Sequence, residues 1–214
     1  MSKRFLSIVA GAVVLFNAAV FAQVSVQPGI TVGMSSFTEK SSSSGITVTA
    51  DSRMGLVAGG VFDISVMNLL SIEPGLLYSM RGMKMEESIQ GYTETITDNF
   101  SYLAIPVHAK LKYPLPMMKP YALAGLNLGI LLSAKQKWEM TGQPSEEYDL
   151  KDSSSTVDMG LDFGAGIEFS LPKITPFVEF VYYMGLLDLA KNPDPDVSTK
   201  SNGWEIKAGL KFKM

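Results

Sequence analysis

Few side chains of this sequence could support catalysis or metal binding. The 214-residue chain has one histidine, His108, and no cysteine. The lack of cysteine excludes disulfides, thiolate nucleophiles and cysteine-bound zinc or iron–sulfur centres. Imidazole is the side chain best suited to acid–base catalysis near neutral pH, but no serine stands at a fixed motif spacing from His108. We therefore predict a structural histidine and no catalytic residue.

Two groups of carboxylates are the remaining candidates. Asp158 and Asp162 lie four residues apart on one face of an expected strand, a distance of roughly 13 Å. That distance is too large for paired carboxylate catalysis, so we expect each to pair with Lys or Arg across the sheet. The others could bind Ca²⁺ through oxygen but lack EF-hand spacing: Glu146, Glu147, Asp149, Asp194 and Asp196. The sequence predicts no metal site, no cofactor and no enzyme.

Composition narrows the class of protein further. Eighteen basic and 21 acidic residues give a net charge of −3, so a nucleic-acid partner is not expected. Charged residues make up only 18% of the chain, below the roughly 25% of ordinary soluble domains. Beyond the N-terminus no apolar run is long enough for a membrane-spanning helix. A low charge with many glycines favours β structure.

The first 22 residues have the pattern of a secretory signal peptide. Lys3 and Arg4 precede an apolar stretch from Phe5 to Val20, and Ala22 ends a small-residue cleavage site. We predict cleavage before Gln23, so that residues 1–22 are the signal peptide and residues 23–214 form one mature domain.

Eight segments show the period-2 alternation of β-strands. They are residues 24–34, 54–64, 72–80, 103–113, 122–132, 159–169, 178–186 and 204–212. In each segment one face is apolar over about ten residues, the length of a tilted transmembrane strand. The opposite face mixes glycine with charged residues.

The connections between these segments alternate in length. Residues 36–52, 85–99, 138–157 and 188–202 are long and polar, whereas residues 66–70, 114–119 and 171–176 are short. Short periplasmic turns and long extracellular loops are typical of outer-membrane barrels. We therefore predict an all-β fold, an eight-stranded antiparallel up-and-down transmembrane β-barrel, with four long extracellular loops.

The polar face of this barrel would point into the lumen. The interior of eight strands is just filled by side chains, and buried charges must be paired. We predict a plugged lumen in which eleven polar residues form a structural network: Glu73, Arg81, His108, Lys110, Lys112, Asp158, Asp162, Glu168, Glu179, Glu205 and Lys207.

Outward-facing aromatic residues fall near the lower ends of the four descending segments. They are Phe62, Tyr113, Phe169 and Phe212. Aromatic girdles mark the membrane interfaces of such barrels. We predict that these four form the periplasmic girdle.

Three segments carry a family resemblance. Residues 101–113, SYLAIPVHAKLKY, resemble the "YLEIPVLLKY" strand of the porin-family outer-membrane β-barrels of Bacteroidetes and related Gram-negative bacteria, which include PorT-like proteins of the type IX secretion system. Residues 158–168, DMGLDFGAGIE, and 203–212, GWEIKAGLKF, are similar to two further strands of that family. The resemblance implies an OmpA/OmpX-like barrel inserted by the outer-membrane assembly machinery. It implies little about activity.

The sequence thus predicts a bacterial outer-membrane protein of structural or interaction type. Its partners would be outer-membrane lipids, the assembly machinery, and secretion-system or surface partners reached through the four long loops. Two alternatives remain open at this point. One is a small transport pore, and the other is a soluble lipocalin-like barrel with its apolar face inside.

Overall fold

The computed structural model describes residues 25–43, 46–49, 51–89, 92–191 and 197–214. The predicted signal peptide, residues 1–22, lies outside the described residues. Eleven strands form one antiparallel sheet. Their bounds are β1 (Ser25–Ser43), β2 (Ile46–Thr49), β3 (Asp51–Ser65), β4 (Leu70–Arg81), β5 (Met83–Ile89), β6 (Tyr92–Lys112), β7 (Met118–Met140), β8 (Glu146–Asp149), β9 (Val157–Phe169), β10 (Ile174–Gly185) and β11 (Val197–Phe212).

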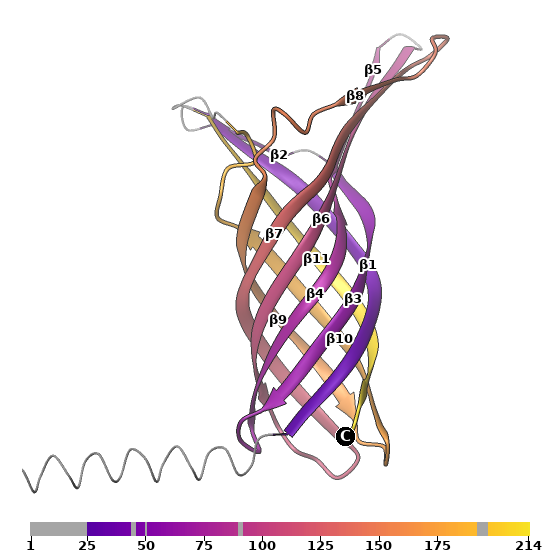
Figure 1. The fold of residues 1–214 in the computed structure, drawn as a ribbon. Helices are drawn as coiled ribbons and strands as arrows, with labels where there is room; N and C mark the ends of the chain where they lie inside the picture. The colour runs from indigo at the N-terminus through magenta and orange to yellow at the C-terminus, as the bar shows by residue number, and fades with distance from the viewer. Residues whose placement is uncertain (1–24, 44–45, 50, 90–91, 192–196) are drawn as a thin grey trace, which may run out of the picture.

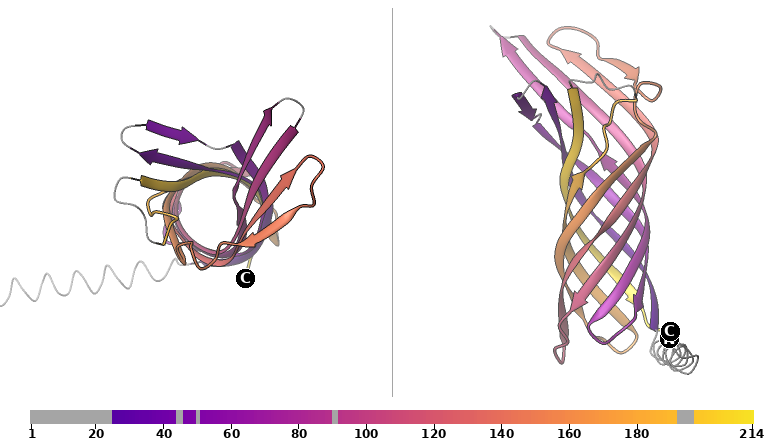
Figure 2. Two further views of the ribbon diagram at one scale, coloured as in Figure 1. Left: turned by 90° about the horizontal axis from the view of Figure 1, so that it is seen from above. Right: turned by 90° about the vertical axis from the view of Figure 1, so that its left-hand side faces the viewer.

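Eight of the strands close into a ring. β1, β3, β4, β6, β7, β9, β10 and β11 each pair with the next, and β11 returns to pair with β1 from Gly29↔Lys211 to Ser43↔Val197. The strands tilt around a common axis (Figure 1), and the ring is closed when seen from above (Figure 2). Closure pairs the backbone of every barrel strand on both sides, which the bilayer requires because unpaired amides there are costly. The eight-stranded barrel predicted from the alternation is confirmed.

The apolar face of each strand points outward. Ile30 is 58% exposed and Leu126 is 55% exposed, although both are large apolar residues. The polar residues of the opposite face are buried in the lumen. This orientation is the reverse of a lipocalin-like barrel, so that alternative is wrong. Among the described residues, no helix is long and apolar enough to cross a membrane.

Short turns lie at the end of the barrel where β1 begins and β11 ends (Figure 1). Val66 and Met67 donate backbone hydrogen bonds to Leu70, and Leu115 donates one to Met118. These tight turns are typical of the periplasmic end of an outer-membrane barrel.

The long connections differ from the expectation of polar loops. β1 continues to Ser43, β7 continues to Met140, and β6 starts at Tyr92. The shorter strands β2, β5 and β8 pair with these extensions. Residues 36–52 and 85–99 are therefore largely paired strands among the described residues, whereas within 138–157 the paired strands are residues 138–140 and β8. The prediction ended each strand where its outward face stops being apolar, but backbone pairing does not need an apolar face once the strand leaves the bilayer.

Glycines on the lumen face sit beneath aromatic rings. A Cβ on Gly160 would lie 2.4 Å from the Tyr183 ring, and one on Gly166 would lie 2.4 Å from the Tyr121 ring. The glycines thus provide the space that these rings fill. A narrow barrel can hold large side chains only if residues opposite them are small.

Candidate functional site

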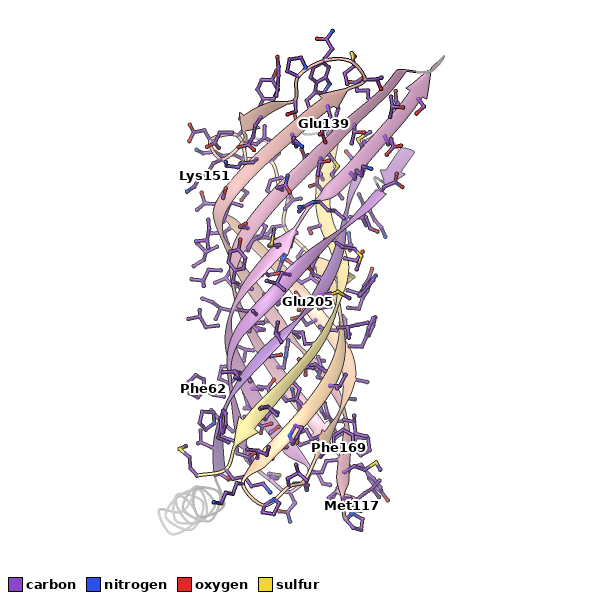
Figure 3. The ribbon with its side chains drawn as sticks, turned by 90° about the vertical axis from the view of Figure 1, so that its right-hand side faces the viewer. Phe62, Met117, Glu139, Lys151, Phe169 and Glu205 are labelled. Carbon is purple, nitrogen blue, oxygen red and sulfur yellow. The ribbon has the colours of Figure 1, made fainter. Side chains whose placement is uncertain are left out.

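The lumen contains all eleven polar residues that the sequence analysis singled out, and each is at least nine-tenths buried. They are Glu73, Arg81, His108, Lys110, Lys112, Asp158, Asp162, Glu168, Glu179, Glu205 and Lys207. The structure divides them into three groups along the barrel axis. Figure 3 shows side chains filling the barrel, with Glu205 at mid-height.

The first group lies toward the periplasmic end and is called here the lysine–carboxylate network. Its members are Asp63, Glu73, Lys110, Lys112, Glu168, Glu179, Glu205, Lys207 and Lys211, joined by nine ion pairs among the described residues. Each ammonium contacts at least two carboxylates. The network is continuous across β3, β4, β6, β9, β10 and β11.

Lys211 has the most carboxylate partners within this network. Its Nζ lies 2.6 Å from Asp63 Oδ2, 2.6 Å from Glu73 Oε2 and 2.7 Å from Glu168 Oε1. The side chain has no solvent exposure, and the ammonium also lies 4.9 Å from the centre of the Phe177 ring. Three negative partners offset the cost of removing this charge from water.

Lys110 links the network to an aromatic hydroxyl. Its Nζ lies 2.6 Å from Glu73 Oε1 and 2.9 Å from Glu179 Oε2. The Tyr121 hydroxyl donates to Glu179 Oε2 at 2.8 Å, and the Tyr121 ring lies 4.5 Å from the Lys110 ammonium.

The second group surrounds His108. Its Nε2 lies 2.8 Å from Asp162 Oδ2, which also accepts a hydrogen bond of 2.9 Å from Asn127 Nδ2. Asp162 therefore pairs with histidine, and the expected Lys or Arg partner for Asp162 is wrong. Periodicity could not reveal this pairing because it depends on the register between β6, β7 and β9.

The third group lies toward the extracellular end and is called here the arginine cage. Arg81 Nη1 contacts Asp158 Oδ2 at 2.6 Å, and the Tyr183 hydroxyl donates to the same oxygen at 2.6 Å. The guanidinium lies 4.8, 5.0 and 4.3 Å from the ring centres of Phe37, Tyr102 and Tyr183. A planar, weakly hydrated guanidinium is suited to such stacking.

Sequence reasoning missed Asp63 and Lys211 as network members. Asp63 is 1% exposed and Lys211 is fully buried. Both lie on the polar faces of their alternating segments, so the same periodicity could have found them. The same alternation places Val57, Val61 and Leu77 on the lumen face, where they pack together as an apolar part of the lumen wall.

The four residues of the predicted girdle all point away from the lumen. Phe62, Tyr113, Phe169 and Phe212 are between 40% and 66% exposed. Phe62 and Phe169 lie near the periplasmic end on opposite sides of the barrel (Figure 3). At the other end of the outward face, Phe180 stacks on Trp204 at 6.4 Å.

Two carboxylates meet at the extracellular mouth. Glu39 lies above the outward apolar residues of β1, which end at Met34. Burial and the charge of nearby Asp98 raise the pKa of Glu39 to about 7. Burial also raises the pKa of Asp98, although a hydrogen bond of 2.9 Å from Gln136 Nε2 opposes that shift.

The acidic residues considered for Ca²⁺ do not form a described site. Asp194 and Asp196 lie outside the described residues. Glu147 pairs with Lys135 at 2.5 Å, Glu146 accepts the Tyr148 hydroxyl, and Asp149 accepts the backbone amide of Lys151. Within the described ranges, no group of three or more His, Asp or Glu side chains could hold a metal ion.

A closed ring of eight strands, apolar outside and charged inside, defines an outer-membrane β-barrel. The chain belongs to the family described as "Outer membrane protein beta-barrel domain", whose pattern matches residues 21–191. The match stops before β11, which closes the ring. The protein is therefore a bacterial outer-membrane protein.

Several solved barrels are similar to this chain. Ail, the attachment invasion locus protein of Yersinia pestis, is 18% identical over 88% of this chain and 99% of Ail, with a TM-score of 0.41. Neisserial surface protein A is 15% identical over 86% and 97%, with a TM-score of 0.42. The N-terminal barrel domain of Pseudomonas aeruginosa OprF is 13% identical over 86% and 97%, with a TM-score of 0.38. No curated protein matches the sequence.

Proposed function

We propose that this barrel is a non-enzymatic outer-membrane protein of structural or interaction type, which presents its extracellular hairpins to partners while its lumen remains plugged. The observation that carries the proposal is the continuation of paired strands beyond the apolar band. β6 and β7 remain paired as far as Glu94↔Met140, and β5 and β8 extend that sheet on both sides. Ordered, projecting strands are suited to holding a binding surface in a fixed position.

The charges of the lumen support the plugged state. Nine ion pairs cross the periplasmic half, and the arginine cage occupies the extracellular half. An ion that passed through the barrel would have to break these contacts. This arrangement favours an interaction protein over the small transport pore.

The narrower PorT-like assignment is part of this proposal. It depends on the resemblance of residues 101–113, 158–168 and 203–212 to that group. Secretion-system components or other surface proteins would then be partners of the hairpins, and the outer-membrane assembly machinery would insert the barrel.

Two measurements test the proposal. In planar lipid bilayers the purified barrel should show no discrete conductance, because the lumen contacts block ions. On cells, a photo-crosslinking residue at exposed Met85 in the projecting strand β5 should capture defined adducts that one at lipid-facing Leu126 does not. Conductance steps together with identical adducts at both positions would favour the pore.

A further inference from the structure

The strands that extend above the barrel form a small sheet with two different faces. This projecting sheet consists of β5, residues 92–100 of β6, residues 133–140 of β7, and β8, and it leans outward from the ring (Figure 2). Side chains alternate between its faces. One face continues the lumen side of the barrel, because Asp98 and Phe100 on β6 are buried there. We call this the inner face and the opposite one the outer face.

The inner face has a row of apolar side chains across three strands. Met85 on β5 is opposite Ile96 on β6, and Ile96 is opposite Trp138 on β7. Met140 and Tyr148 extend this apolar surface. Met85 is 39% exposed and Tyr148 is 49% exposed, so part of this surface is open to a partner.

Every charged side chain described on the inner face is acidic. Glu87 and Glu94 face each other across β5 and β6, and with Met85 and Ile96 they line a hollow of about 210 Å³. Glu146 lies opposite Trp138. The Trp138 indole donates to Glu94 Oε1 at 2.6 Å, which fixes the ring beside the carboxylates.

The outer face has the opposite character. Its three lysines each pair with a nearby carboxylate: Lys84 with Glu86 at 2.7 Å, Lys135 with Glu147 at 2.5 Å and Lys137 with Glu139 at 2.8 Å. With Asp149 opposite Lys135, the outer face carries three lysines and four carboxylates. The inner face instead combines apolar area with carboxylates and no described lysine or arginine.

We infer that the inner face docks an amphipathic polypeptide segment of a partner protein, in which lysine or arginine side chains flank apolar ones. This inference rests on the proposed interaction function and specifies the chemistry of the partner. The apolar row would bury the apolar side chains, and Glu87, Glu94 and Glu146 would accept hydrogen bonds from the basic ones. Neighbouring strands are about 4.8 Å apart, so the four-stranded sheet is wide enough for one extended or helical segment.

Charge argues against the other occupants. Anionic lipid headgroups and nucleic acids would be repelled by the same carboxylates. A second copy of this chain docked face to face would place Glu87 and Glu94 against their own counterparts. A basic amphipathic segment satisfies both the apolar and the charged features.

The experiment uses the full mature chain in nanodiscs of neutral lipid. The probes are two synthetic peptides of equal length with the same leucines, one carrying lysines and the other glutamates between them. Calorimetry measures the dissociation constants. Fluorescence of Trp138 in a Trp204→Phe background reports where binding occurs, because the chain has only two tryptophans.

Two double variants provide a matched comparison. Glu87→Gln with Glu94→Gln removes two charges from the inner face, and Glu86→Gln with Glu139→Gln removes two from the outer face at a similar height. The lysine peptide should bind about tenfold more weakly to the inner variant and no more than about twofold more weakly to the outer one. The glutamate peptide should not bind.

Several results would overturn the inference. They are equal binding of both peptides, equal weakening by both double variants, self-association that the inner variant abolishes, and a Trp138 response to anionic vesicles. If the inner variant has no effect but removal of residues 84–97 abolishes peptide binding, this inference fails while the proposed function stands. If crosslinking at Met85 on the inner face also yields no specific adduct, both fail.

Discussion

In the periplasmic half of the lumen, Lys211 contacts three carboxylates, whereas in the extracellular half Arg81 contacts one carboxylate and three aromatic rings. The two cations are both buried but are stabilised differently. An ammonium is a compact charge with three donors, so several anions can share it. A guanidinium is flat and can lie against rings. The comparison shows that one barrel can bury charge through ion pairing at one end and through aromatic packing at the other.

Among substitutions of the two buried cations, replacement of Lys211 should lower the free energy of unfolding the most. Lys211→Met leaves the buried carboxylates of Asp63, Glu73 and Glu168 with fewer cations. We expect a loss of about 3–5 kcal/mol in the free energy of unfolding, measured by urea titration in micelles. Lys213→Met is the control, because Lys213 is exposed and its side-chain ammonium donates to the Leu171 carbonyl and forms no described ion pair. Equal effects would show that the network does not stabilise the barrel.

Arg81→Lys tests the arginine cage with a smaller expected effect. The lysine keeps the charge and can still reach Asp158, but it loses most of the planar stacking on Phe37, Tyr102 and Tyr183. We expect a loss of about 2 kcal/mol in the free energy of unfolding, measured in the same titration. Arg53→Lys is the control, because Arg53 is only half-buried and no aromatic stacking is described for it. If Arg81→Lys has the same free energy of unfolding as the wild type, stacking of the guanidinium on the rings does not stabilise the barrel.

Glu39 extends the comparison to the extracellular mouth, where no ion pair to Glu39 or Asp98 is found among the described residues. The pKa of Glu39 is raised from 4.5 to about 7, so the folded protein holds this proton more tightly than the unfolded chain. The protonated Glu39 carboxyl therefore contributes fully to the free energy of unfolding below about pH 4.5, and this contribution is lost as the pH rises through 7.

Glu39→Gln should remove this part of the pH dependence. Between pH 5 and pH 8 we expect the unfolding free energy of the wild type to fall by roughly 1–2 kcal/mol more than that of the variant. Glu147→Gln, at an exposed position, should leave the wild-type profile unchanged. Parallel profiles for wild type and Glu39→Gln would contradict the prediction.

Periodicity was enough to predict the membrane-spanning part of the fold. Apolar residues alternate with polar ones in all eight segments because one face meets lipid and the other meets the lumen. Above the bilayer that difference disappears. Thr93, Thr95 and Thr97 on β6 face solvent on one side, and the opposite side is mixed, so no alternation marked residues 92–100 as a strand.

Which residues contact each other in the lumen is harder to predict than which residues point into it. The face of His108 follows from its place in the alternation, but its contact with Asp162 depends on how β6, β7 and β9 are staggered. The same holds for Lys211, whose three partners come from β3, β4 and β9. Stagger is set by turn geometry and by closure of the whole ring, neither of which a single segment reveals.

The pairing of β1 with β11 also has a kinetic consequence. Residues that are almost the whole chain apart, such as Gly29 and Lys211, become neighbours. Joining ends so distant in sequence costs on the order of 5 kcal/mol of chain entropy, and it cannot happen before the last strand has been synthesised and delivered. Pairing of β1 with β11 is therefore the step that commits the chain to the folded barrel. Until it forms, both terminal strands keep an unpaired edge, which makes the incomplete barrel the species most exposed to aggregation and proteolysis.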